Sequence, residues 1–291
     1  MNSNLKILSV GSLCNKVVTE FSSQVAFNIT SKILATTTEV NTQFNHQISE
    51  FLGVDTRILI LVLEGSQPKD FELFTQIAQQ AKELEILTLF VGVVSYSKDP
   101  NKYSDSLQSF KKLSALVDAS FIIDANQLNI IDKDASFENE PSNLEALLTK
   151  QLKGICQLAH FPDHTYVKES NLKDFKSLFS QSSHAIYTEG LARGADRAQV
   201  ALQRAINNLI VAPQNIKQAK QVMIIMSTGS KELSLDEVGQ INVGIIKITD
   251  EPNIIMGVRE EDSLQDALKV QIIFTGTDWV GELLAKNKQL N

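Results

Sequence analysis

Two strongly apolar runs on either side of an amphipathic segment are the feature that most limits the possible folds of this chain. The first run is Arg57–Leu63 and the second is Ile86–Val94. Continuous apolar strands are typical of the centre of a parallel sheet that is covered on both faces. Between them, apolar residues recur at helical spacing from Phe71 to Leu84. A strand, a helix and a second strand in this order predict a βαβ unit and therefore an α/β fold.

Further elements are predicted on both sides of this unit. The alternation of strands and helices continues, so the first half is predicted to be a doubly wound α/β domain with a parallel sheet, covering residues 1–141. The polar, acidic stretch 132–141 is predicted to be a loop at its end. The additional elements are a strand at Lys6–Val10, a helix at Asn15–Phe21, a helix at Tyr103–Leu116 and a strand at Ser120–Asp124.

A capping box marks the start of a long helix near the middle of the sequence. Ser142 would cap this helix and Glu145 stands three residues later. A stripe of apolar residues then runs to Leu158, which predicts a central connecting helix at 142–160. The remaining residues, 161–291, are predicted to form a smaller α+β domain. Its helices are predicted at Leu172–Phe179, at Asp196–Asn207 and after the capping box Ser234–Glu237, and its strands at Ala185–Tyr187, Gln221–Ser227, Asn253–Val258 and Leu268–Thr275.

Composition narrows the classes of protein to which the chain can belong. The 291 residues are 43% hydrophobic, with a formal net charge of −7 and no block of Lys or Arg. A nucleic-acid binder needs a basic face, so nucleic acid is not expected as a partner. No apolar run reaches the roughly 18 residues of a membrane span, and no signal peptide is recognisable. Cys14 and Cys156 are far apart and are expected to be free thiols in the cytoplasm.

A set of short motifs in the second half carries a family resemblance. In order and spacing they resemble the FtsZ/tubulin superfamily over about residues 140–277, and the first half resembles it more loosely. The resemblance implies a nucleotide-type first domain, a central helix and a smaller second domain. The motifs are Glu189–Gly190, Arg193–Ala198, Ala205–Asn208, Ser227–Ser230, Leu233–Val238 and Ile272–Gly276, with Lys6–Gly11, Cys14–Asn15 and Ala78–Val94 in the first half.

Arg193 and Arg197 stand at the start of a predicted helix within these motifs. Two arginines at such a place fit either the recognition of a phosphate or the packing of the domain through ion pairs. We favour the packing role. The pair His160 and His164 is interrupted by Pro162, so no metal site is predicted there.

The resemblance also implies where GTP would bind. Gly11 and Asn15 correspond to the first phosphate loop of the family, and Gly65 and Ser66 to the glycine-rich second loop. Asn126, after the next strand, corresponds to a position that contacts the nucleotide. These five residues are the candidate nucleotide site.

Both phosphate loops lack most of the family's glycines. Glycines let several backbone N–H groups point at one anion without interference from Cβ atoms. In the second loop only Gly65 remains, and Pro68 has no N–H to donate. Glu64 and Asp70 place carboxylates where a triphosphate would lie, and Leu13 adds bulk to the first loop. The simplest alternative for the second loop is a plain junction in which Pro68 and Asp70 form the first turn of a helix.

The resemblance places the catalytic loop of the family after the central helix. In relatives this loop carries two aspartates into the nucleotide site of a neighbouring subunit. The corresponding residues here are Glu169, Asn171 and Asp174, so one carboxylate is replaced by an amide that cannot accept a proton. A polar helix start, with Asn171 as the cap, is the alternative interpretation.

Together these features predict an FtsZ-like protein that has lost GTP hydrolysis, with GTP binding either lost or retained. It would act through association with proteins, either itself or another FtsZ-like filament, as a filament partner or regulator. No cofactor is then expected. The main alternative is a self-assembling cell-division GTPase that binds GTP with Mg²⁺ in an unusual pocket; a different enzyme on the old pocket is a third possibility. Direct membrane binding is not expected, since residues 277–291 are too short for the family's linker and tail.

Overall fold

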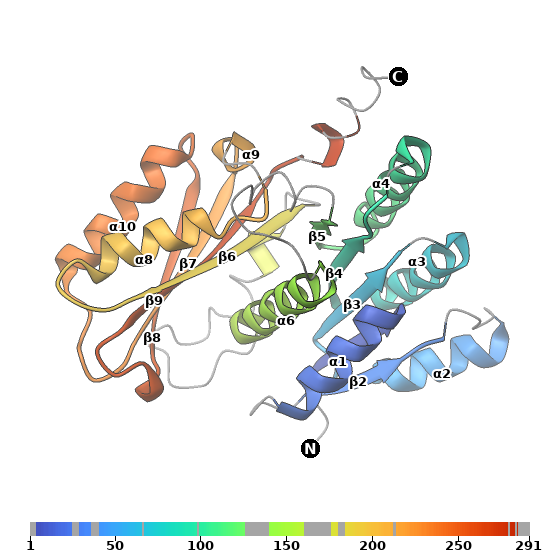
Figure 1. Ribbon diagram of the computed structural model, residues 1–291. Helices are drawn as coiled ribbons and strands as arrows, with labels where there is room; N and C mark the ends of the chain where they lie inside the picture. Colours follow the sequence, from blue (N-terminus) through green and yellow to red (C-terminus); the bar gives the residue numbers. More distant parts are fainter. Residues whose placement is uncertain are drawn as a thin grey trace. The chain divides into compact units, whose positions relative to one another are not determined.

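The computed structural model describes residues 4–24, 29–35, 41–65, 67–97, 99–125, 140–159, 176–179, 184–211, 214–278, 280–282 and 284. Contacts within the chain divide it into two units (Figure 1). The first unit comprises Met1–Lys153 with Asp278–Asn291, and the second comprises Gly154–Thr277. The predicted domain limits of 1–141, 142–160 and 161–291 remain our proposal for how the domains are delimited in the sequence.

The first unit is built on a five-stranded sheet in the order β2-β1-β3-β4-β5, and all neighbouring strands are parallel. The apolar runs that predicted central strands form β3 and β4, and every residue of β4 is buried. The strand predictions near Lys6 and Ser120 are also confirmed. The edge strand β2 was not predicted. The strands are β1 (Leu5–Val10), β2 (Ile29–Ile33), β3 (Ile58–Glu64), β4 (Leu87–Val94) and β5 (Ala119–Asp124).

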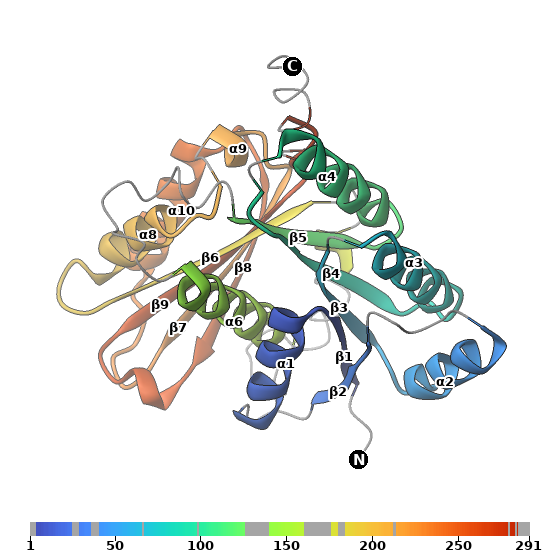
Figure 2. The same cartoon turned by 45° about the vertical axis from the view of Figure 1, so that its right-hand side comes forward.

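Helices cover both faces of this sheet, which confirms the doubly wound arrangement. Figure 2 shows α1 on one side of the sheet and α2, α3 and α4 on the other. The ends of the helices follow local chemistry: Asn41 caps α2, Asp99 caps α4, and Pro68 occupies the first position of α3. The helices are α1 (Ser12–Gln24), α2 (Thr42–Leu52), α3 (Pro68–Glu83) and α4 (Pro100–Ser114).

The second unit contains a four-stranded mixed sheet in the order β6-β9-β7-β8. β9 runs antiparallel to β6 and β7, and β8 runs parallel to β7. With its helices this sheet forms the predicted α+β arrangement, so the fold class is confirmed. The elements are β6 (Ala185–Ala192), α8 (Arg197–Asn207), α9 (Gln214–Lys217), β7 (Gln221–Thr228), α10 (Leu235–Ile248), β8 (Asn253–Glu260), the 3₁₀ turn η1 (Asp262–Leu264) and β9 (Leu268–Thr275).

Several predicted boundaries differ from those in the structure. The central helix α6 (Glu140–Ala159) begins before Ser142, which therefore lies inside the helix instead of capping it. Strand β6 continues to Ala192, whereas the sequence predicted a strand that ends at Tyr187. Its second half contains Gly190, which weakens any strand prediction. Among the described residues, no helix is long and apolar enough to cross a membrane.

Arg197 organises the helical side of the second unit. Its side chain is fully buried, and its guanidinium donates hydrogen bonds to both carboxylate oxygens of Glu237, at 2.6 and 3.2 Å. Glu237 also completes the predicted capping box with Ser234 at the start of α10. Three carbonyl oxygens accept the remaining hydrogen bonds of the guanidinium, those of Lys231, Glu232 and Asp266. The packing role predicted for Arg197 is confirmed. Arg193 makes an exposed ion pair with Asp266.

This ion pair predicts a loss of stability in acid. The hydrogen bond from Arg197 lowers the pKa of Glu237 to about 2, from an ordinary value of 4.5. A carboxylate with a lowered pKa stabilises the fold above pH 4.5, and this contribution is lost as the pH falls toward 2. We expect urea unfolding to be easier for Glu237→Gln than for wild type at pH 6, with the difference shrinking toward pH 3. A difference that does not change with pH would contradict this assignment.

Candidate functional site

The candidate nucleotide site lies at the carboxyl edge of the first sheet. In doubly wound sheets, ligands bind outside the carboxyl ends of the strands, where the strand order reverses. In the order β2-β1-β3-β4-β5 this reversal falls between β1 and β3. β1 leads into Gly11, and β3 ends at Glu64 and leads into Gly65. The structure therefore brings Gly11 of the first predicted loop next to Glu64, which leads into Gly65 of the second.

The carboxylate of Glu64 lies against the first loop and the start of α1. The backbone N–H of Leu13 donates a hydrogen bond to Oε2 of Glu64 at 2.9 Å. Gly11 has a φ of +101°, and a Cβ atom at this position would stand 2.6 Å from Cβ of Glu64. The chain thus needs a glycine here both for its backbone conformation and for the close approach of β3. The N-terminus of α1 is occupied by a carboxylate of the protein itself.

The pKa of the Cys14 thiol is influenced by the same carboxylate. Its thiol is buried, and burial together with the neighbouring Glu64 carboxylate raises its pKa well above the ordinary value. A thiol at a helix N-terminus usually has a lowered pKa, because the partial positive charge of the helix favours the thiolate. The opposite direction here follows from desolvation first and from Glu64 second.

Asn15 is engaged by the fold around it. Its Oδ1 accepts a hydrogen bond from Oγ of Ser9 at 2.8 Å, and its Nδ2 donates to the carbonyl oxygen of Leu34 at 3.5 Å. Its backbone N–H donates to the carbonyl oxygen of Gly11. Asn15 therefore joins β1, the start of α1 and the residue that follows β2.

Aromatic rings cover Gly65 in the second loop. A Cβ atom at Gly65 would stand 2.6 Å from Cζ of Phe71 and 3.0 Å from Cζ of Phe110. The two rings meet edge to face, with their centroids 5.1 Å apart. This glycine therefore serves the packing of α3 and α4. Ser66 lies outside the described residues.

The start of α3 is a plain junction between strand and helix, as in the alternative interpretation of the second loop. Pro68 is the first residue of the helix, Gln67 provides no side-chain cap, and Asp70 lies in the first turn. Asp70 is buried, and its desolvation raises its pKa. Within the described part of the chain, its Oδ1 meets no hydrogen-bond donor. This N-terminus thus also carries a carboxylate of the chain, and its first residue has no N–H.

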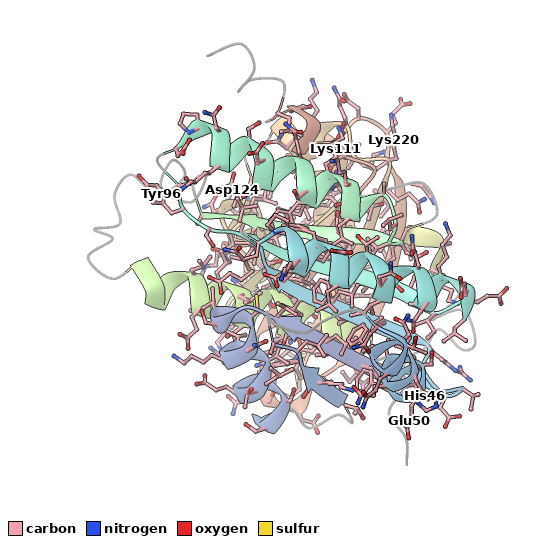
Figure 3. The ribbon with its side chains drawn as sticks, turned by 90° about the vertical axis from the view of Figure 1, so that its right-hand side faces the viewer. His46, Glu50, Tyr96, Lys111, Asp124 and Lys220 are labelled. Atoms are coloured by element: carbon pink, nitrogen blue, oxygen red, sulfur yellow. The ribbon has the colours of Figure 1, made fainter. Side chains whose placement is uncertain are left out.

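The remaining predicted residues are placed only in part. Asn126, Glu169, Asn171 and Asp174 lie outside the described residues. Just before Asn126, Asp124 ends β5 and accepts a hydrogen bond from the hydroxyl of Tyr103. Figure 3 shows Asp124 at the same end of the sheet as Tyr96, which follows β4. Within the part of the chain that is described, no group of three or more His, Cys, Asp or Glu side chains is arranged to hold a metal ion.

The sequence predicts that Glu64 and Asp70 are unfavourable for a triphosphate, but it does not predict two contacts. One is the bond from Leu13 to Glu64, which joins residues 51 positions apart. The other is the pair of rings over Gly65. Phe71 was placed on the apolar stripe of its helix, but its convergence with Phe110 depends on how α3 and α4 pack.

Comparisons with known proteins agree with this architecture. Residues 183–278 match the model of the FtsZ family, C-terminal domain. The cell division protein FtsZ of Aquifex aeolicus is 24% identical over 202 residues, which are 68% of this chain and 54% of the relative. The chain spans about half the length of the curated relatives it matches.

Solved structures with the same fold cover nearly the whole chain. An empty FtsZ dimer from M. jannaschii has a TM-score of 0.74 at 16% identity, over 93% of this chain and 88% of that one. GDP-form protofilaments of TubZ from Bacillus thuringiensis serovar israelensis have a TM-score of 0.72 at 10% identity, over 99% of this chain and 91% of that one. At these identities the structures establish the fold alone. Together with the matches in sequence, they support the assignment of the chain as a divergent member of the FtsZ/tubulin superfamily.

Proposed function

We propose that this FtsZ-like protein neither binds nor hydrolyses GTP and acts through association with other proteins. The observation that carries the proposal is the carboxylate of Glu64 at the N-terminus of α1, 2.9 Å from the backbone nitrogen of Leu13. A phosphate group in a doubly wound fold would accept its hydrogen bonds from such N–H groups. In this chain the hydrogen bond is already made to an internal anion.

The residues present do not fit a nucleoside triphosphate with Mg²⁺. A phosphate oxygen about 4 Å from the Glu64 carboxylate would be repelled by about 4 kcal/mol per pair of unit charges at an effective dielectric constant near 20. The rings of Phe71 and Phe110 fill the space next to Gly65, where a phosphate would need close access to the backbone. Asp70 adds a second carboxyl group at the start of α3. No catalytic step through GTP is therefore derived for this chain.

If GTP is neither bound nor hydrolysed, association with proteins is the remaining activity that the family relationship suggests. Among the structural relatives, FtsZ of M. jannaschii was solved as a dimer and TubZ as protofilaments. We propose that the partner is a second copy of this chain or another FtsZ-like filament, which the chain joins or regulates without catalysis. Because the matched relatives are cell division proteins, we place this association in cell division.

Calorimetric titration of the protein with GTP and Mg²⁺ tests the proposal. We expect no heat of binding, no release of phosphate and no GTP-dependent light scattering, while an active FtsZ in the same buffer gives all three. Binding at micromolar GTP would overturn the proposal and favour a GTPase with an unusual pocket. Association is tested separately by sedimenting the protein alone at several concentrations and together with a polymerised FtsZ. Failure to sediment above the level of a bovine serum albumin control would remove the filament role.

A further inference from the structure

We infer that Glu64 is a built-in anionic ligand for the N-terminus of α1. Its carboxylate keeps this N-terminus ordered and excludes external phosphate from it. The inference rests on the proposed function and extends it from a lost site to an occupied one. If it is correct, the anion site persists beneath Glu64. Removing this one carboxylate would then open the site to inorganic phosphate.

The need for an anion at this place arises from α1 itself. The helix has 13 residues and no acidic residue in its first turn. The first N–H groups of any helix lack partners within the helix and carry a partial positive charge. The carboxylate that meets Leu13 comes instead from β3, 51 positions along the chain. A contact made over such a distance in sequence forms only when β1 and β3 are paired.

Glu64 is fixed from both sides. Its backbone is in register with Val93 of β4 at the end of the strand pair. Its Cβ lies where a side chain at Gly11 would otherwise stand, so Gly11 and Glu64 fit each other closely. Burial raises the pKa of the Cys14 thiol, and the nearby Glu64 carboxylate adds to this rise. The carboxylate is therefore held against the helix by the fold.

This arrangement does for the free protein what a bound phosphate does in a nucleotide-dependent fold. It satisfies an N–H group of the helix, opposes the charge of the helix terminus and tethers the first loop to β3. An external phosphate would have to displace a carboxylate that is tethered and consequently present at high effective concentration. The carboxyl ends of β1 and β3 and the loop after β1 would thus be ordered in the absence of nucleotide.

Hydrogen exchange followed by mass spectrometry tests the inference at the site. Glu64→Ala removes the carboxylate, Glu64→Gln keeps an acceptor for Leu13 but removes the charge, and Glu50→Ala removes an exposed carboxylate on α2 as the control. Peptides that cover residues 11–24 are measured with and without inorganic phosphate, at constant pH and ionic strength set with chloride. Thermal unfolding is followed in the same solutions.

In Glu64→Ala we expect exchange at the start of α1 to rise about fivefold or more, and the melting temperature to fall by about 2–4 °C. Phosphate should reverse part of both changes in a concentration-dependent manner. Glu64→Gln should keep more of the protection and show a weaker response to phosphate. Wild type and Glu50→Ala should not respond beyond the chloride control.

Three results would each overturn the inference. The first is unchanged exchange at the start of α1 in both Glu64 variants. The second is a failure of phosphate to restore protection in Glu64→Ala, and the third is an equal response to phosphate in wild type. If Glu64→Ala does not fold, Glu64→Gln decides alone, and the absence of any phosphate response in it counts against the inference. The proposed function fails separately, when unmodified protein binds GTP.

Discussion

Replacing Arg197 with alanine is expected to destabilise the second unit by about 3–5 kcal/mol, because it leaves the buried carboxylate of Glu237 without its cation. The guanidinium also satisfies three carbonyl oxygens around the start of α10. Its loss therefore leaves the acceptors on the loops before α10 and before β9 without a hydrogen-bond donor. Urea unfolding followed by far-ultraviolet circular dichroism measures the change.

Arg193→Ala is the matched control for this prediction. Arg193 belongs to the same motif and also pairs with a carboxylate, but the side chains of Arg193 and Asp266 are 56% and 58% exposed. Exposed pairs contribute about 0–1 kcal/mol. Arg197→Lys tests geometry, since an ammonium cannot reproduce the planar set of donors. Equal effects of Arg193→Ala and Arg197→Ala would show that burial does not govern the contribution of this arginine.

The sequence predicted those parts of the fold whose burial is uniform along the chain. Strands β3 and β4 are apolar at nearly every position because both faces of the sheet are covered. Strand β2 was missed because it is short, lies at an edge and has a mixed burial pattern. Helix α2 was missed although Asn41 and the spacing of its buried Phe44, Ile48 and Leu52 are readable signals.

The candidate site was predictable in its chemistry but not in its contacts. The shortage of glycines and the presence of Glu64 are properties of the sequence alone, and they indicated an altered phosphate loop. The hydrogen bond from Leu13 to Glu64 depends on the register of β1 against β3, in which Val10 lies opposite Leu63. Local patterns do not encode such a register. The rings over Gly65 likewise depend on the packing of α3 against α4.

Gly190→Ala is expected to destabilise the second unit by about 1–3 kcal/mol or more, through overpacking between β6 and α8. A Cβ atom at Gly190 would stand 2.0 Å from the carbonyl oxygen of Ala201 and 2.5 Å from the nitrogen of Ala205. Both are backbone atoms, so no side chain can rotate away to relieve the clash. The hydroxyl of Thr188 donates to the carbonyl oxygen of Ala205, which holds the helix at this short distance. The helix must therefore move away from β6 or the strand must bend.

Gly239→Ala is the matched control, and it is expected to change the free energy of unfolding in the opposite direction. Gly239 lies within α10, and a Cβ atom there would meet nothing within 4 Å. Alanine in an exposed helical position is about 0.8–1 kcal/mol more favourable than glycine, so this variant should be more stable than wild type. Urea midpoints of both variants are compared under identical conditions. Two shifts in the same direction would contradict the close approach of α8 to β6. Shifts of opposite sign would show that Gly190 is required by this packing, as is expected where a helix lies directly on the backbone of a strand.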